Sequence, residues 1–224
     1  MKGEKVRGMS KLTLYHGSKS GLEGPIRLTS RNRLSLDFGQ GFYMGDEPTQ
    51  PRTLICSGAS PTLYTLSFDL DGLKVHHFEP DEEWAMFIAL NRGKLEKYRN
   101  RPFYRRLLDI RKHNDVIFGK IANDKMFGVL TNFFDGVIGL TALVESLAAL
   151  NIGNQYCALT EKAFSHIKIE RTKKYSAREC ELLKARHERQ LGYALKVADR
   201  ICKLKRREGQ SFDEIIERLE KEAK

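Results

Sequence analysis

Residues 37–46, DFGQGFYMGD, hold three glycines and the adjacent aromatic pair Phe42 and Tyr43. Neither a helix nor a strand gains stability from closely spaced glycines, because glycine has no side chain to pack. A glycine within a strand marks a bulge or a close approach by another group. The stretch therefore predicts a binding strand, with a ligand close to its backbone beside Gly39, Gly41 and Tyr43.

Other chemistries have weaker signals in the sequence. The cysteines are far apart, no C-x-x-C pair occurs, and no histidine stands at metal-ligand spacing, so we expect reduced thiols and no metal site. The SGAS segment at 57–60 lacks the nucleophile-elbow pattern, and FGKIAND lacks the second element of a phosphate loop. The four cysteines are Cys56, Cys157, Cys180 and Cys202.

The formal net charge of +10 favours phosphate-rich partners, although a solubilising surface explains it equally well. Residues 92–125 are basic, with Tyr98, Phe103 and Tyr104 interleaved. Basic side chains hold a nucleic-acid backbone while aromatic rings stack on bases, so this segment is the candidate nucleic-acid surface. A second basic cluster is KLKRRE at 203–208.

No apolar run approaches the ~20 residues that span a bilayer, so no membrane association is expected. The N-terminus is basic but has no apolar stretch of signal-peptide length, which favours a cytoplasmic protein.

Hydrophobic periodicity predicts an α+β fold that positions these residues. Expected strands cover 11–18, 62–70, 74–78, 115–121 and 155–159. Expected helices cover 48–55, 81–91, 95–113, 140–150 and 160–167.

From residue 176 the pattern changes to two charged amphipathic helices, each opened by capping-box spacing (Ser176 with Glu179, Ser211 with Glu214). We expect a domain over 1–175 and a helical C-terminal extension over 176–224. The extension either covers the core or offers an apolar face to a partner.

Three motifs resemble the ADP-ribosyltransferase superfamily in its poly(ADP-ribose) polymerase branch. GQGFYMGDEPTQ resembles that branch's GKGIYFAD strand, YHGS its His-Gly-Ser/Thr strand, and GNQYCAL the strand that begins Asn-Glu-Tyr. The three motifs occur in the family's order. The set also resembles an uncharacterised bacterial family of the superfamily with toxin-like members, over residues 12–168. The resemblance implies a split β-sheet core.

The resemblance implies NAD as cosubstrate, no metal, and His16, Tyr43 and Gln155 as catalytic residues. His16 would bind a ribose hydroxyl, the Gly17 backbone the nicotinamide carboxamide, and the Tyr43 ring would stack on nicotinamide. The NAD-binding residues implied are His16, Gly17, Ser18, Gly41, Tyr43 and Leu54.

Two departures from the family pattern bear on activity. Gln155 stands where the polymerases carry glutamate, and an amide can orient by hydrogen bonding but cannot take a proton. Asp124 and Glu161 are the candidates for an assisting acid. Pro51 and Leu54 replace a carboxamide-binding serine and a second stacking tyrosine, which leaves Leu54 to cover nicotinamide.

The leading hypothesis is a bacterial mono-ADP-ribosyltransferase that modifies nucleic acid or protein. Because such an enzyme endangers its own cell, we expect a toxin of a toxin–antitoxin pair, with the antitoxin or another partner on the C-terminal helices. The alternative is a non-catalytic module of the same fold that binds nucleic acid through residues 92–125. The third hypothesis is an enzyme of a neighbouring branch that acts on 2′-phosphorylated RNA ends. It ranks last because the basic side chains that would bind the extra phosphate cannot be identified.

Overall fold

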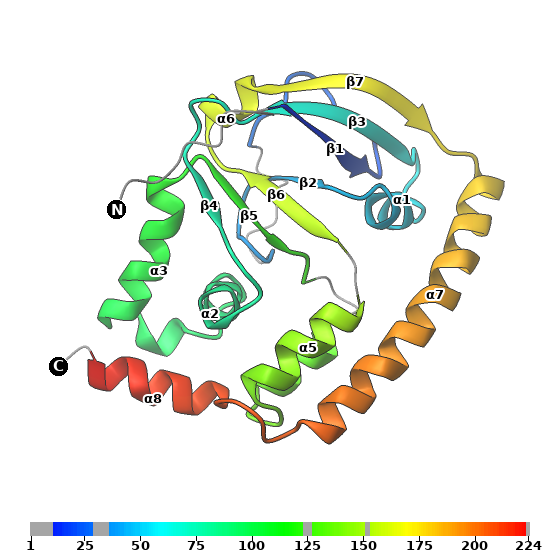
Figure 1. The fold of residues 1–224 in the computed structure, drawn as a ribbon. Helices are drawn as coiled ribbons and strands as arrows, with labels where there is room; N and C mark the ends of the chain where they lie inside the picture. The colour runs from blue at the N-terminus through cyan, green and yellow to red at the C-terminus, as the bar shows by residue number, and fades with distance from the viewer. Residues whose placement is uncertain (1–10, 29–35, 123–126, 151–152, 223–224) are drawn as a thin grey trace.

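A mixed seven-stranded sheet forms the centre of the protein (Figure 1). The computed structural model describes residues 11–28, 36–122, 127–150 and 153–222. The spatial order of the strands is β4-β5-β6-β2-β1-β3-β7, and every described pair except β4–β5 is antiparallel. The strands are β1 (Lys11–Ser18), β2 (Phe42–Gly45), β3 (Thr62–Asp69), β4 (Val75–His77), β5 (Val116–Lys120), β6 (Asn154–Ala158) and β7 (Ile167–Lys174).

The junction between β1 and β2 is the weakest in the sheet. β1 pairs with β3 along its whole length, whereas it pairs with β2 only where Tyr15 faces Gly45. We call this junction the seam. It divides the half-sheet β4-β5-β6-β2 from the half-sheet β1-β3-β7, so little backbone pairing resists their separation.

Successive side chains on the strands alternate between two apolar clusters, one on each side of the sheet. Tyr43 and Cys157 face the cluster around Trp84, which we call the α2 face. Phe42 and Tyr156 face the other cluster, which includes Phe164 and which we call the α6 face.

Helices cover both faces of the sheet, and most of them lie on the α2 face (Figure 1). No described helix is long and apolar enough to cross a membrane. The helices are α1 (Thr49–Ile55), α2 (Glu82–Asn91), the 3₁₀ helix η1 (Glu96–Tyr98), α3 (Pro102–His113), α4 (Phe127–Phe134), α5 (Leu140–Leu150), α6 (Glu161–Ser165), α7 (Ala177–Leu204) and α8 (Phe212–Glu222).

Several predicted elements are confirmed together with their caps. Asp81 accepts a hydrogen bond from the Trp84 backbone N–H at the start of α2, and Thr160 caps α6 through the Ala163 N–H. The predicted helix over 95–113 is wrong in its first part, where η1 is followed by α3 beginning at Pro102. Proline favours the first helical position and disfavours helix in the residue before it.

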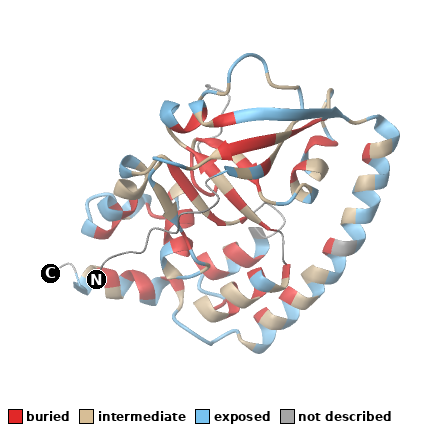
Figure 2. Cartoon of the chain, turned by 45° about the horizontal axis from the view of Figure 1, so that its top comes forward, coloured by how far each residue is buried: buried red, intermediate tan, exposed pale blue. Residues whose placement is uncertain are grey.

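Two elements were missed by the sequence analysis: α4 and the edge strand β7. Every residue of β7 after Ile167 is exposed (Figure 2). Its sequence IKIERTKK is charged, as edge strands often are, and lacks the apolar alternation of a half-buried strand. Ile167, which we assigned to the preceding helix, begins β7 instead.

The two helices of the C-terminal extension are confirmed, and both capping boxes are formed. Their apolar stripes are buried in the same cluster as Trp84 of α2. Those stripes therefore belong to the protein's own core and are not a face for a partner. The buried residues are Leu191, Ala198, Cys202, Phe212, Ile215, Ile216 and Leu219.

Replacing Phe212 by alanine should lower the free energy of unfolding by about 3–5 kcal/mol, because a fully packed ring leaves a cavity. Its ring meets those of Phe133 and Phe134 at centroid distances of 5.7 and 5.4 Å. The control Leu204→Ala, at a side chain 73% exposed, should change it by less than about 0.5 kcal/mol. Urea denaturation measures both. Equal effects would contradict the shared core.

Candidate functional site

The glycines of residues 37–46 are approached by the protein's own side chains. Gly39 has φ +75°, and a β-carbon there would collide with Nη1 of Arg111. A β-carbon at Gly41 would collide with Sγ of Cys157 on β6. The sequence predicted a ligand beside these glycines. The structure shows a guanidinium and a thiol as the neighbours.

Arg111 of α3 holds the loop before β2 by binding its carbonyl groups. Its Nη1 donates to the Phe38 carbonyl at 2.9 Å, and its Nη2 donates to the Gln40 carbonyl at 2.7 Å. Asn91 at the end of α2 donates to the Asp37 carbonyl at 3.2 Å. The loop is thus fixed from α2 and α3, and Arg111 points inward although it belongs to the basic segment 92–125.

Asp37 is a buried carboxylate with three hydrogen-bond donors. Arg92 Nη2 lies 2.6 Å from its Oδ1, while Gln155 Nε2 and the Ala122 backbone N–H lie 2.9 and 2.8 Å from its Oδ2. Burial raises the pKa of Asp37 above its usual value, and these contacts oppose that shift. The cluster joins the loop before β2 to α2, to β6 and to the segment after β5.

The position of Asp37 explains why residue 155 is glutamine. Gln155 is buried, and its amide N–H donates to the carboxylate of Asp37. A glutamate there would place two carboxylates in contact and would remove this donor. The acidic group near position 155 is therefore supplied by Asp37, to which the sequence analysis assigned no role.

Tyr43 lies opposite Cys157 in the β2–β6 ladder and on the same face as Gln155. Its hydroxyl donates to the Gly39 carbonyl at 2.6 Å and accepts from the Phe38 backbone N–H at 3.0 Å. Burial raises its pKa well above the usual value, so the phenol is neutral. The hydroxyl is committed to the loop, while the ring remains partly exposed.

His16 lies at the seam and connects its two sides. Its Nδ1 is 2.8 Å from the Tyr43 carbonyl, and its ring stacks on Phe42 with a centroid distance of 4.3 Å. Burial lowers the pKa of His16, so the imidazole is neutral near pH 7. Because Nδ1 must donate to the carbonyl, Nε2 is left as an acceptor.

The structure thus places His16, Tyr43 and Gln155 on the adjacent strands β1, β2 and β6. Their side chains do not share a face. His16 stacks on Phe42 on the α6 face, whereas Tyr43 and Gln155 belong to the α2 face. A group that contacts all three would therefore have to reach both faces of the sheet.

The remaining predicted binding residues have other neighbours. Gly17 lies against α1, where a β-carbon would collide with Ile55 and stand 2.7 Å from the Pro51 carbonyl oxygen. Ser18 closes a turn by donating to the Gly21 carbonyl at 2.9 Å. Leu54 is 50% exposed, so the structure does not bring it to the seam.

Neither candidate assisting acid is placed beside Gln155. Asp124 lies outside the described residues. Glu161 is exposed in the first turn of α6, a helix that packs on the opposite face of the sheet from Gln155. In the described ranges, no group of three or more histidine, cysteine, aspartate or glutamate residues could hold a metal ion.

The aromatic residues of segment 92–125 do not form a stacking surface. Phe103 and Tyr104 are buried, and Tyr98 packs against the α2-face core. Rings held in the core cannot stack on nucleic-acid bases, so that part of the expectation is corrected. The four cysteines are free and buried, as expected, and burial raises the pKa of Cys157 to about 12.

A comparison with protein-family models matches residues 12–169 to one family, described as "Protein of unknown function (DUF3990)". Comparisons with curated proteins and with solved structures gave no match. The matched range contains β1, β2 and β6, and hence the seam and the cluster around Asp37.

Replacing Gly39 by alanine should destabilise the protein by ~3–5 kcal/mol. Positive φ accounts for ~1–2 kcal/mol, and the displacement of Arg111 from two carbonyls accounts for the rest. The matched control is Gly72→Ala, where φ is +71° and no described atom lies within 4 Å of the new methyl group. Denaturant unfolding measures both variants. Equal losses would show that the contact of Arg111 with the loop adds nothing.

The lowered pKa of His16 predicts a pH dependence of stability. The folded state binds fewer protons than the unfolded state, so stability is complete above the unfolded pKa of about 6.5. It should fall as pH drops from 6.5 toward the lower folded pKa. NMR titration of the His16 ring should give a midpoint below pH 6.5. In His16→Asn, the free energy of unfolding should no longer show this part of its dependence on pH. A midpoint above 6.5 would contradict a buried neutral imidazole.

Proposed function

The chain belongs to the DUF3990 family of proteins of unknown function, and we propose that it is an NAD-dependent mono-ADP-ribosyltransferase with a split-sheet core. One observation carries the proposal: the three motifs that resemble the superfamily fall on β1, β2 and β6, which are neighbours in the sheet. Strands so far apart in sequence need not be adjacent, so the position of β2 between β1 and β6 supports the resemblance.

The groups at the seam have the chemistry that NAD requires. The acceptor Nε2 of neutral His16 suits a ribose hydroxyl, and the partly exposed ring of Tyr43 suits stacking on nicotinamide. Since Asp37 takes the N–H of Gln155, the amide carbonyl is the group that can accept a hydrogen bond from a second hydroxyl. Asp37 acts here as a positioning residue.

In the proposed reaction the bond between ribose C1′ and the nicotinamide nitrogen breaks, and its electron pair leaves with nicotinamide. The acceptor atom forms the new bond to C1′ and releases its proton to solvent, because Gln155 cannot take it. The oxocarbenium-like transition state requires an oriented ribose, which hydrogen bonds donated by its hydroxyls to His16 and Gln155 would provide.

Binding of nicotinamide beside Gly17 requires α1 to move. The backbone of Pro51 and the side chain of Ile55 occupy the space next to Gly17. α1 is seven residues long and is held by Ile55, which is buried in a cluster with Leu63 and Cys180, so its movement must open that cluster. The proposal therefore requires that α1 is displaced when the cosubstrate binds.

The acceptor is a nucleic acid or a protein, and a toxin held by an antitoxin remains part of the proposal. Because the apolar stripes of α7 and α8 are buried in the core, such a partner would have to bind another surface. The competing candidate is a non-catalytic nucleic-acid-binding module, which the packing of α1 against Gly17 favours.

Labelled NAD incubated with the protein and with cellular RNA, DNA or lysate should release nicotinamide and transfer label. His16→Ala should lower the rate at least about tenfold, because the ribose loses an oriented acceptor. The matched control is His166→Ala: His166 Nδ1 also contacts a backbone carbonyl, that of Asp69 at 3.0 Å, but at β3 on the far side of β1. This control should keep the wild-type rate.

Absence of both transfer and NAD hydrolysis in the wild type would favour the non-catalytic module. If His16→Ala and His166→Ala lower the transfer rate equally, the loss reflects reduced stability of the protein and not a role of His16 in the reaction. Tyr43→Phe keeps the ring but loses two hydrogen bonds to the loop, so it should retain more activity than Tyr43→Ala.

A further inference from the structure

A small cationic cavity lies between α1 and α7. Its volume is about 170 Å³, below the ~300 Å³ of a typical small-molecule site, so it suits a compact group. Two guanidinium groups, one imidazole and two hydroxyl groups line it, and none of the described lining residues is acidic. The lining residues are Thr49, Arg52, Thr53, Leu183, Arg186 and His187.

Arg52 indicates what the cavity would bind. Its Nε is buried and has no hydrogen-bond partner among the described residues. A buried N–H of a cation without an acceptor is unfavourable, so an anion that reached it would be held strongly. Arg186 enters the same cavity from α7 and forms no ion pair with any described carboxylate.

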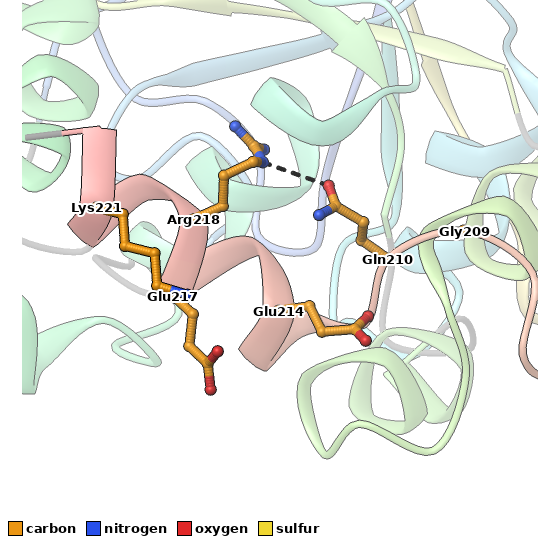
Figure 3. Close-up of a pocket in the computed structure, with 6 residues that line it drawn as sticks. All are labelled: Gly209, Gln210, Glu214, Glu217, Arg218 and Lys221. Carbon is orange, nitrogen blue, oxygen red and sulfur yellow. Dashed lines mark hydrogen bonds between the residues drawn. The ribbon is translucent and has the colours of Figure 1, made fainter.

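The larger cavity beside α8 provides a contrast (Figure 3). Two cations, Arg218 and Lys221, line it together with two glutamates. Arg218 already bonds Gln210 at 3.4 Å and forms ion pairs with Glu82 and Glu222 at 2.5 and 2.8 Å. Because these partners compensate the charge of Arg218, an anion would be held less strongly in that cavity. The cavity beside Arg52 therefore differs in charge balance as well as in size.

Exposed residues lie along the outer side of α7 (Figure 2), and beside the cavity residues of this helix they include a basic stripe. The stripe residues are spaced three, four, seven or eight apart, which places them on one helix face, and all are exposed. Tyr193, 75% exposed, lies within the stripe. At 1.5 Å per residue the stripe extends over about 33 Å, several phosphates along a nucleic-acid strand. Its basic residues are Arg178, Arg186, Arg189, Lys196 and Arg200.

We propose that the cavity between α1 and α7 binds one phosphate of a nucleic acid and that the stripe on α7 binds the adjoining backbone. Tyr193 is placed to stack on a base, as aromatic residues do in single-strand binding. This surface replaces segment 92–125, whose Phe103 and Tyr104 rings are buried, as the nucleic-acid site. That the bound strand is the acceptor rests on the proposed function, whereas the binding itself does not.

The test is fluorescence anisotropy with a labelled 20-nucleotide single-stranded RNA, without NAD. Replacing both Arg52 and Arg186 by alanine should weaken binding at least about tenfold at ~100 mM salt. The slope of log K against log salt should become shallower by about 0.7, because the cavity binds one phosphate of the single strand. Tyr193→Ala should weaken binding about tenfold.

The matched control replaces Arg105 and Arg106, two exposed arginines of α3, by alanine, which removes the same charge from the other candidate surface. This variant should bind within about twofold of wild type. Arg186→Glu alone, at an exposed position, tests the cavity without disturbing α1 and should also weaken binding.

Two further outcomes would overturn the proposal: equal weakening in the α3 control, or unchanged binding in the folded Arg186→Glu variant. In calorimetry, inorganic phosphate should bind to wild type more weakly than the RNA and compete with it. Phosphate binding without RNA binding would assign the cavity to a free anion instead of a nucleic acid. Because NAD is omitted throughout, failure here leaves the transferase proposal to its own test.

Discussion

The buried carboxylate of Asp37 constrains the rest of the site. A charge without water must be matched by nearby donors, and Arg92, Gln155 and the Ala122 backbone N–H provide them. These donors come from α2, from β6 and from the segment after β5, so one group fixes three parts of the chain relative to β2. Removing a partner from such an ion pair typically costs ~3–5 kcal/mol. The cluster therefore makes the loop before β2 a rigid support.

Beside this rigid cluster lies the least constrained junction of the sheet. β1 and β2 share one paired position, and His16 bridges them through a side chain instead of a backbone ladder. The imidazole remains neutral because it is buried, and this preserves an acceptor at Nε2. The loop before β2 is held firmly, whereas β1 is paired only loosely with β2. This arrangement would suit a site that opens to admit a ligand.

The sequence predicted most elements, because burial on one face leaves an alternating or helical pattern, as over 62–70 and 81–91. It failed for β7, whose exposed residues carry no such pattern. The resemblance identified positions 16, 43 and 155, but it did not reveal the partner of Gln155, since Asp37 lies 118 residues earlier. The charge of segment 92–125 also gave a wrong nucleic-acid surface, because Arg92 and Arg111 point inward and the rings of Phe103 and Tyr104 are buried.

The 28-residue helix α7 begins beside the half-sheet β1-β3-β7 and ends on α5, against the other half (Figure 1). α7 therefore connects the two half-sheets, and they can separate only as far as this helix bends. Gly192 lies within it with no described atom near its missing side chain, and glycine makes a helix locally easier to deform. If a ligand entered between the half-sheets, α7 would therefore have to bend, although this helix lies away from the ligand and faces solvent.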